Sequence, residues 1–357
     1  MIKKIVLGAG GIVILGILYL LLWPVPFSPA AWTPETLPAL IGVYAPNSKL
    51  ALIKKLNLDG GVGPEDTAVD SRGRIYTGLD DGRILRCLLN GDSLEVFCDT
   101  NGRPLGMAFD ATGNLVVADL DKGLISVNPE GQIRVLAKEA GGIPIKLADD
   151  LDIATDGTIY FSDATTKYSS NELMLDLLEH RGNGRLLAYT PKTKTTRVLI
   201  DNLYFANGVA LSPDESFVLV NETWKYRIKR YWLTGSKKGQ SDIFIKNLPG
   251  FPDNITSNRQ DTFWLALVQG PKTRNVLDSL LPKPFLRKII YRLPEFLSPA
   301  PTVVGYVLGL DINGNVTHNL QDLTGEFYGE ITSVSEHNGV LFFGSLSEKT
   351  IGYIAVP

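Results

Sequence analysis

The sequence has 357 residues, 44% of them hydrophobic and 20% charged, with a formal net charge of −3 at pH 7. This composition excludes an intrinsically disordered chain, and without a basic excess no nucleic-acid-binding surface is expected. A chain of this length holds either two ordinary domains or one repetitive architecture.

The first predicted element is an apolar helix close to the N-terminus. Lys3 and Lys4 precede an uncharged apolar run over residues 5–23, which as a helix would be about 30 Å long, enough to cross a hydrocarbon core. Because positive residues beside a membrane span stay in the cytoplasm, the rest of the chain is expected on the periplasmic, extracellular or lumenal side. A cleavable signal peptide is the alternative, with a usual apolar core of about 7–15 residues.

The chain after the apolar run shows no linker that would divide it into two domains. The predicted division is a cytoplasmic N-terminus (1–4), a transmembrane signal-anchor (5–23), a linker (24–45) and one folded body (46–357). Within the body a hairpin pattern recurs, in which a short apolar strand enters a turn of aspartate, asparagine and glycine, and a strand of β-branched and aromatic residues follows.

Six copies of this hairpin are present. Clear copies cover residues 68–76, 108–116 and 152–160, and looser copies begin near Leu211, Ser257 and Glu336. Most are spaced by roughly 40–60 residues, which is typical of a propeller with several strands per blade. The sequence therefore predicts an all-β, six-bladed β-propeller rather than a β-sandwich.

A longer gap before the last copy departs from the strand pattern. Residues 272–297 are predicted to form an amphipathic helical insertion that Pro282 and Pro284 break into pieces. Its apolar positions are Val276, Leu277, Leu280, Leu281, Phe285, Ile289 and Ile290, and its basic positions are Lys283, Arg287, Lys288 and Arg292. The insertion is compatible with packing on one end of the propeller, with a lid over the tunnel mouth, or with contact to a membrane surface.

Two cysteines, Cys87 and Cys98, flank a turn sequence at residues 90–93. In an exported chain they could form a disulfide across a hairpin. A pair of free thiols is the equal alternative, and the spacing does not decide between the two.

Acidic and amide residues stand immediately before the inner strands of several predicted blades. They are Glu65 and Asp66 before the first copy, Asp149 and Asp150 before the third, Asn207 before the fourth, and Asp253 and Asn254 before the fifth. Since the innermost strands of a propeller surround its tunnel, these side chains are expected to converge on the axis. Bare carboxylates would repel one another there, and calcium prefers such oxygen ligands, whereas zinc favours histidine or thiolate. Turn formation is the alternative role for any single one of them.

Five segments carry a resemblance to a known family, namely residues 159–163, 184–189, 205–212, 217–223 and 248–255. Together they resemble the strictosidine synthase-like and adipocyte plasma membrane-associated protein family, within the calcium-dependent phosphotriesterase superfamily of paraoxonases and gluconolactonases. The resemblance covers the body from about residue 45 to the C-terminus. It implies a six-bladed propeller, a Ca²⁺ cofactor and a single-pass N-terminal anchor.

The resemblance also implies roles for the residues before the inner strands. The residues that match the catalytic-calcium ligands of paraoxonases are Glu65, Asn207, Asp253 and Asn254. Asp149 stands where those enzymes have an asparagine, and its extra charge is expected to tighten cation binding while damping the Lewis acidity of the metal. Asp66 and Asp150 match ligands of a second, structural calcium.

Two positions depart from the pattern of the enzymes in this superfamily. Leu105 stands where paraoxonases have a histidine that is proposed as general base, and Thr332 stands where strictosidine synthase has its glutamate. Glu330 lies two residues from that position, which is the better part of 7 Å along a strand. The condensation chemistry of strictosidine synthase is therefore not expected.

Two hypotheses for function follow. The first is a calcium-dependent hydrolase of carboxylic esters or lactones, with Asp253 or Asp149 as nucleophile or base and a hydrophobic substrate held by an apolar rim that includes Trp264 and the insertion. The second is a non-catalytic, membrane-anchored propeller in which calcium is structural and one face is a binding platform. The sequence does not identify the substrate, because loops at the tunnel mouth set it.

Overall fold

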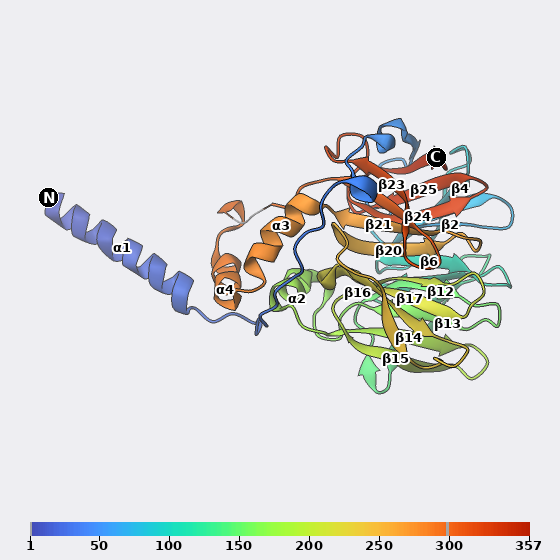
Figure 1. Ribbon diagram of the computed structural model, residues 1–357, viewed down its shortest axis with the longest axis horizontal. Helices are drawn as coiled ribbons and strands as arrows, with labels where there is room; N and C mark the ends of the chain where they lie inside the picture. The colour runs from blue at the N-terminus through green and yellow to red at the C-terminus, as the bar shows by residue number, and fades with distance from the viewer. Residues whose placement is uncertain (1, 298–299) are drawn as a thin grey trace.

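The body of this computed structural model consists of six four-stranded antiparallel sheets (Figure 1). The structure describes residues 2–297 and 300–357; for residues 2–9 and 295 it describes the backbone only. The first three sheets are β2 (Thr67–Val69), β3 (Arg74–Gly78), β4 (Arg83–Leu88) and β5 (Glu95–Asp99); β6 (Pro104–Phe109), β7 (Leu115–Asp119), β8 (Gly123–Val127) and β9 (Ile133–Ala137); and β12 (Ala148–Ile153), β13 (Ile159–Asp163), β14 (Gly184–Thr190) and β15 (Thr195–Leu203). The next two are β16 (Ala206–Leu211), β17 (Phe217–Glu222), β18 (Arg227–Trp232) and β19 (Ser241–Ile245); and β20 (Phe251–Ser257), β21 (Phe263–Gln269), β22 (Gly305–Leu310) and β23 (Val316–Asp322).

The sixth sheet closes the ring with strands from both ends of the body. It contains β24 (Ile331–His337), β25 (Val340–Ser345), β26 (Thr350–Ala355) and, paired antiparallel with β26, β1 (Lys54–Asn57). The inner strands β2, β6, β12, β16, β20 and β24 each contact the next one around the ring. The predicted six-bladed propeller is thus confirmed, whereas the contribution of β1 to the last blade was not predicted.

The recurring hairpin turn is held by its own aspartate. In the first blade the Asp70 carboxylate accepts hydrogen bonds from the backbone N–H groups of Arg72 and Arg74, both at 2.9 Å, and Gly73 adopts a φ of 74°. Asp110 makes the same pair of bonds in the second blade. Aspartate and glycine therefore recur at fixed offsets because the turn needs a side-chain acceptor and a left-handed residue.

The hydrophobic core is divided among the interfaces between blades. Ala68, Tyr76 and Ile84 of the first blade pack with Met107 and Leu115 of the second. Equivalent clusters lie between each further pair of neighbouring blades, including the last and the first. Each sheet is thus buried on both faces, which leaves the inner strand edges free to line the tunnel.

The helices gather at one end of the propeller (Figure 1). They are α2 (Leu173–Glu179), α3 (Pro271–Leu280) and α4 (Pro284–Arg292), with the 3₁₀ turns η3 (Ser170–Glu172), η4 (Thr223–Lys225) and η5 (Glu295–Leu297). The remaining elements are η1 (Gly42–Tyr44), η2 (Lys49–Leu52) and the short hairpin of β10 (Glu139–Ala140) and β11 (Ile143–Pro144). The predicted insertion at 272–297 and its break near the two prolines are confirmed by α3, α4 and η5.

Two of the basic positions of the insertion are buried in α4. Arg287 is fully buried and Arg292 is 8% exposed, while Phe285 is 54% exposed. Both arginines turn inward because their guanidinium groups donate to backbone carbonyls of other segments, Arg287 to Leu178 at 2.7 Å and Arg292 to Leu20 at 2.6 Å.

The N-terminal helix α1 (Ile2–Leu22) extends away from the propeller (Figure 1). For residues 5–9 of the predicted anchor, the structure describes the backbone but not the side chains. Within the described part of the chain, no helix meets the length and apolarity needed to cross a membrane. The backbone of the predicted anchor at 5–23 is helical up to Leu22.

The two cysteines are free thiols, so the disulfide alternative is wrong. The pairing of β4 with β5 places Cys98 opposite Ile84 rather than opposite Cys87. Burial raises the pKa of Cys87 to about 11 and that of Cys98 to about 12. Neither thiol is therefore a reactive thiolate at neutral pH.

Candidate metal centre

The candidate ligands lie at irregularities in the inner strands. The pairing of three inner strands, β12, β16 and β20, with their neighbours shifts between Ala148 and Leu151, between Ala206 and Val209, and between Pro252 and Ile255, whereas β2, which follows Glu65, pairs regularly. In a regular strand successive side chains point to opposite faces, whereas a bulge redirects them. These bulges coincide with two consecutive buried polar residues at Asp149–Asp150 and at Asp253–Asn254.

Glycine lets the bulged strands approach one another. A Cβ atom on Gly208 would lie 2.5 Å from the carbonyl oxygen of Asp253 on the neighbouring blade. The Asn221 amide donates a hydrogen bond to that same carbonyl, and the Thr223 hydroxyl donates to the carbonyl of Pro252 at 2.7 Å. The backbone that carries Asp253 is therefore fixed from the fourth blade.

Three carboxylates of the candidate site lie within reach of one another's charge. Burial raises the pKa of Asp253 well above its usual range, and the charges of Glu65 and Asp149 raise it further. Burial and the Glu65 charge likewise raise the pKa of Asp149, while Arg103 lowers it. Burial also raises the pKa of Glu65, against the opposing effect of Arg103. The three side chains thus form one electrostatic unit at the starts of β2, β12 and β20.

The amides of the candidate site leave buried oxygens without a partner. Asn207 Oδ1 and Asn254 Oδ1 accept no hydrogen bond, and both side chains are almost fully buried. Buried polar atoms are normally paired in native structures. Two unpaired amide oxygens beside three buried carboxylates therefore point to a positively charged partner.

The donor chemistry of these residues fits calcium. All five predicted ligands, Glu65, Asp149, Asn207, Asp253 and Asn254, are buried and offer oxygen, which is the donor that Ca²⁺ prefers. The carboxylates do not form a compact cluster, since no group of three or more histidine, cysteine, aspartate or glutamate side chains in residues 10–294, 296–297 and 300–357 is placed to hold a metal ion. The fit therefore rests on a mixed set of carboxylates and amides.

A second acidic pair, Asp66 and Asp150, lies next to the first set. Asp66 Oδ2 accepts from the backbone of Met107 at 2.9 Å, and its Oδ1 is unpaired. Asp150 accepts from Val209 at 2.7 Å and from Leu151 at 2.8 Å. A cavity of about 240 Å³ borders this pair but none of the five predicted ligands. Asp66 and Asp150 therefore separate the predicted ligands from a cavity farther along the inner strands.

In protein stripped of metal by a chelator, Asp66→Asn is expected to become more stabilising as pH rises. Burial raises the pKa of Asp66 to about 6, so the folded state favours the neutral acid, and this contribution is lost as pH rises through that value. Relative to the wild type, the variant should gain about 2.4 kcal/mol in free energy of unfolding between pH 4 and pH 8.

Urea denaturation at a series of pH values measures this gain. Asp201→Asn is the matched control, because Asp201 is exposed on the outer strand β15. A difference between Asp66→Asn and wild type that stays constant with pH would contradict the prediction.

The two positions that depart from the enzyme pattern have structural roles. Leu105 packs with Leu147 and Phe205 in an apolar cluster at the ligand end of the inner strands. Thr332 donates its hydroxyl to the backbone carbonyl of Glu65 at 2.6 Å. Neither residue is available as a base, and the position of Glu65 depends on Thr332.

Two features of the site differ from the sequence prediction. Trp264 is fully buried between blades and donates to Glu336 at 2.7 Å, so its predicted place on the rim is wrong. Arg103 was not singled out, yet its guanidinium donates to Glu65 Oε2 at 3.2 Å. Its position directly before the segment that contains Leu105 is the only sequence signal for it.

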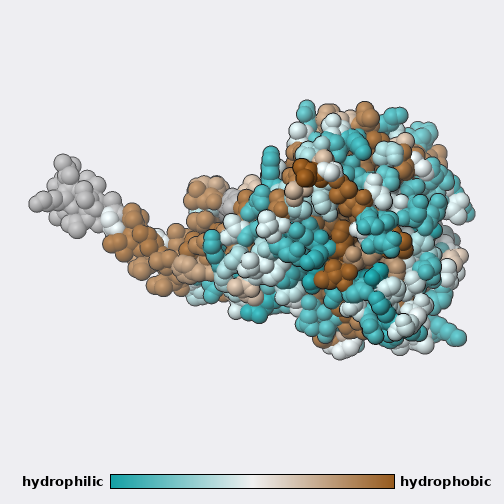
Figure 2. Space-filling model, in the orientation of Figure 1, coloured by the Kyte–Doolittle hydropathy of each residue, from teal (hydrophilic) through white to brown (hydrophobic). Residues whose placement is uncertain are grey.

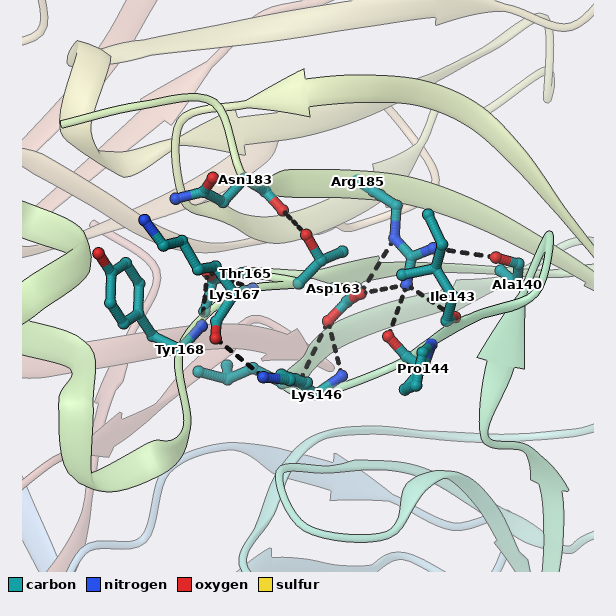
Figure 3. A network of polar contacts seen from close by, with 12 residues as sticks. Ala140, Ile143, Pro144, Lys146, Asp163, Thr165, Lys167, Tyr168, Asn183 and Arg185 are labelled. Atoms are coloured by element: carbon teal, nitrogen blue, oxygen red, sulfur yellow. Dashed lines mark hydrogen bonds and ion pairs between the residues drawn. The ribbon is translucent and has the colours of Figure 1, made fainter. Parts of the chain in front are cut away.

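A buried ion pair supports the entry into β12 (Figure 3). Arg185 contacts Asp163 at 2.5 Å and donates to the carbonyls of Ala140 at 3.0 Å and Pro144 at 3.1 Å. The other oxygen of Asp163 accepts from the backbone of Leu147 at 3.0 Å, two residues before Asp149. The Arg185–Asp163 pair therefore fixes the backbone that leads to a predicted ligand.

Comparisons with known proteins place this arrangement in a family. A model of strictosidine synthase matches residues 149–236, and a model of the strictosidine synthase-like N-terminal region matches residues 42–87. Adipocyte plasma membrane-associated protein of Bos taurus is 36% identical, with 93% of this chain and 85% of the relative covered. Strictosidine synthase-like 4 of Arabidopsis thaliana is 35% identical, with coverages of 90% and 89%.

Solved structures agree on the fold alone. A gluconolactonase from Xanthomonas campestris superposes with a TM-score of 0.62 at 18% identity, covering 94% of this chain and 99% of the other. A calcium-binding regucalcin from Agrobacterium tumefaciens superposes with a TM-score of 0.58 at 13% identity, with coverages of 85% and 93%. From its relatives, the chain belongs to the strictosidine synthase-like family that includes adipocyte plasma membrane-associated protein.

Proposed function

We propose that this protein is a calcium-dependent hydrolase of carboxylic esters or lactones. The observation that carries the proposal is the set of three buried, mutually repelling carboxylates and two unpaired amide oxygens at the starts of the inner strands. The lactonase-like fold of the structural neighbours is consistent with it. Asp66 and Asp150 would hold a second, structural calcium.

In this mechanism the side chains of the protein bind the cation and transfer a proton. Glu65, Asp149, Asn207, Asp253 and Asn254 would hold calcium, which when bound polarises the substrate carbonyl and stabilises the oxyanion. Asp253 acts as general base on the attacking water and returns the proton to the leaving oxygen, with Asp149 as the alternative. Burial and the neighbouring carboxylates raise the pKa of Asp253, and a bound cation would oppose this shift and favour the ionised form that can accept a proton.

A non-catalytic role is the second candidate, and the positions of Leu105 and Thr332 favour it. Both residues are committed to packing or to a backbone hydrogen bond, so neither supplies the group that the related enzymes use. In that case calcium would join the blades, and the helical end of the propeller would serve as a binding platform.

The proposal includes a membrane anchor at residues 5–23, with residues 1–4 in the cytoplasm and the propeller on the opposite side. The uncharged sequence of this segment and the lysines before it support the topology. The name of the mammalian relatives, adipocyte plasma membrane-associated protein, supports an association with a membrane.

The test is ester and lactone hydrolysis by the full chain in detergent with saturating calcium. Phenyl acetate and a panel of lactones are expected to be hydrolysed, and Asp253→Asn should lower kcat by about 10²–10⁴-fold, the usual contribution of a general base. Asp201→Asn is the matched control and should retain the wild-type rate. Equal rates for wild type and Asp253→Asn, together with a melting temperature that falls on chelation, would establish the structural role instead.

A further inference from the structure

The helix α4 has its polarity reversed relative to a helix that faces water. Its arginines Arg287 and Arg292 are buried, whereas Phe285 is 54% exposed, Leu286 37% and Tyr291 41%. A surface helix of a soluble domain normally turns its apolar residues inward and its charged residues outward. The following turn η5 continues the exposed apolar face with Phe296 at 84% and Leu297 at 57%.

Hydrogen bonds explain why this reversal is stable. Arg287 donates to the carbonyls of Leu178 at 2.7 Å, Leu281 at 3.1 Å and Ala30, and thereby ties α2, the end of α3 and the linker together. These carbonyls accept hydrogen bonds from both terminal nitrogens of the buried guanidinium group, while its Nε has no partner among the described residues. Phe285 and Leu286 remain exposed on α4, at 54% and 37%.

The exposed face of α4 continues into α1. Arg292 donates to the carbonyl of Leu20 at 2.6 Å and to that of Trp23, at the C-terminal end of α1. The ring of Tyr291 packs edge-on against Phe27, with 5.3 Å between the ring centroids. Figure 2 shows apolar surface running from α1 to the helices at the end of the propeller. One occupant can therefore cover both helices.

The exposed side chains of α1 indicate which kind of partner would cover both helices. Four consecutive residues, Ile12, Val13, Ile14 and Leu15, are each at least 60% exposed. Consecutive residues on a helix point in directions about 100° apart, so apolar side chains surround α1. A protein partner or a second copy would cover one side of such a helix, whereas lipid surrounds it completely.

We propose that the outer face of α4 and η5, formed by Phe285, Leu286, Phe296 and Leu297, lies on the lipid bilayer that holds α1. The proposal rests on the membrane anchor included in the proposed function. Lys283, exposed at the start of α4, would meet the lipid headgroups. A helix of this kind lies in the plane of the interface, with its apolar side chains about 5–10 Å below the headgroup boundary.

This docking also orients the tunnel. The helix α3 follows β21, whose last residue Gln269 pairs with Phe251 at the start of β20. Asp253 lies at that same end of β20. The end of the propeller that carries the predicted ligands would therefore face the bilayer, and a substrate dissolved in the membrane would be close to it.

Site-specific fluorescence on the full chain tests the proposal. Single cysteines at Phe285→Cys, Phe296→Cys, Ile14→Cys and Ile243→Cys are labelled with a nitrobenzoxadiazole probe and reconstituted in phosphatidylcholine–phosphatidylglycerol vesicles. Nitroxide groups on the acyl chains, either shallow or deep, act as quenchers. Ile243 is the matched control, since it is 45% exposed on the outer strand β19. The unsubstituted chain measures any labelling of Cys87 and Cys98.

The shallow nitroxide is expected to quench the probes at positions 285 and 296 several-fold more than the probe at 243. The deep nitroxide should quench the probes at 285 and 296 less than the shallow one does. The probe at 14 should be quenched most by the deep nitroxide. Quenching at 14 without quenching at 285 and 296 would overturn the docking of α4 and leave the anchor intact. No lipid quenching at any position would overturn both. Probes at 285 and 296 that become shielded only as protein concentration rises would show that a second copy covers the face, which also overturns the proposal.

Discussion

Arg185→Met is expected to lower the free energy of unfolding by about 3–5 kcal/mol, the usual cost of removing one partner of a buried ion pair. The Arg185 side chain is 4% exposed, and Asp163 is completely buried. Methionine retains much of the aliphatic volume but leaves the Asp163 carboxylate without its cation. It also leaves the carbonyls of Ala140 and Pro144 without a donor.

The loss should depend on pH. Burial raises the pKa of Asp163, and Arg185 holds it down, so removing the guanidinium raises the pKa of the folded state further. Because the variant then favours the neutral acid, its stability falls as pH rises through that pKa. The difference between Arg185→Met and wild type is therefore smaller in mild acid than at pH 8.

Urea denaturation with two further variants isolates the ion pair. Arg185→Met/Asp163→Asn should recover much of the loss, since it removes the unpaired charge and keeps an oxygen that accepts from the backbone of Leu147. Arg230→Met removes a partly exposed arginine that pairs with Asp242 at 2.9 Å and should cost at most about 1 kcal/mol. Equal losses for Arg185→Met and Arg230→Met would show that the buried network does not stabilise the entry to β12.

The fold was predictable because its signal is local and repeated. The turn around Asp70 requires an aspartate acceptor and a glycine at fixed offsets, and the same requirement returns in later blades. The positions of Glu65, Asp149 and Asp253 before inner strands could likewise be read from their place in each copy. The contribution of β1 to the last blade has no such signal, because it depends on where the two ends of the body meet.

Features that depend on contacts between segments were not predictable. The periodicity of α4 separates apolar from basic positions, but it does not tell which of them are buried, because the carbonyls that bind Arg287 belong to the distant residues Leu178 and Ala30. The distance between Cys87 and Cys98 is set by the register of β4 against β5, which the turn sequence alone does not reveal. The role of Thr332 likewise depends on the carbonyl of Glu65, which is distant in sequence.

Calcium is expected to raise the free energy of unfolding by about 4 kcal/mol at a free concentration a thousandfold above its dissociation constant. The physical reason is that Glu65, Asp149 and Asp253 repel one another in the folded protein when no cation is bound. A bound cation offsets this repulsion. For a single-domain chain of this size the corresponding rise in melting temperature is roughly 10 °C. Magnesium should raise it less, because it requires a near-octahedral site and gives up its water reluctantly.

Thermal denaturation of the full chain in detergent, with chelator and then with increasing calcium, measures this effect. Glu65→Gln removes one charge from the predicted ligands and should shift the calcium titration to higher concentrations, while the exposed-site variant Asp201→Asn should follow the wild type. A melting temperature that does not respond to calcium would contradict the assigned ligands. Since stability does not depend on turnover, the measurement tests the metal centre separately from hydrolysis. A calcium response without ester hydrolysis would therefore favour the structural role that Leu105 and Thr332 already suggest.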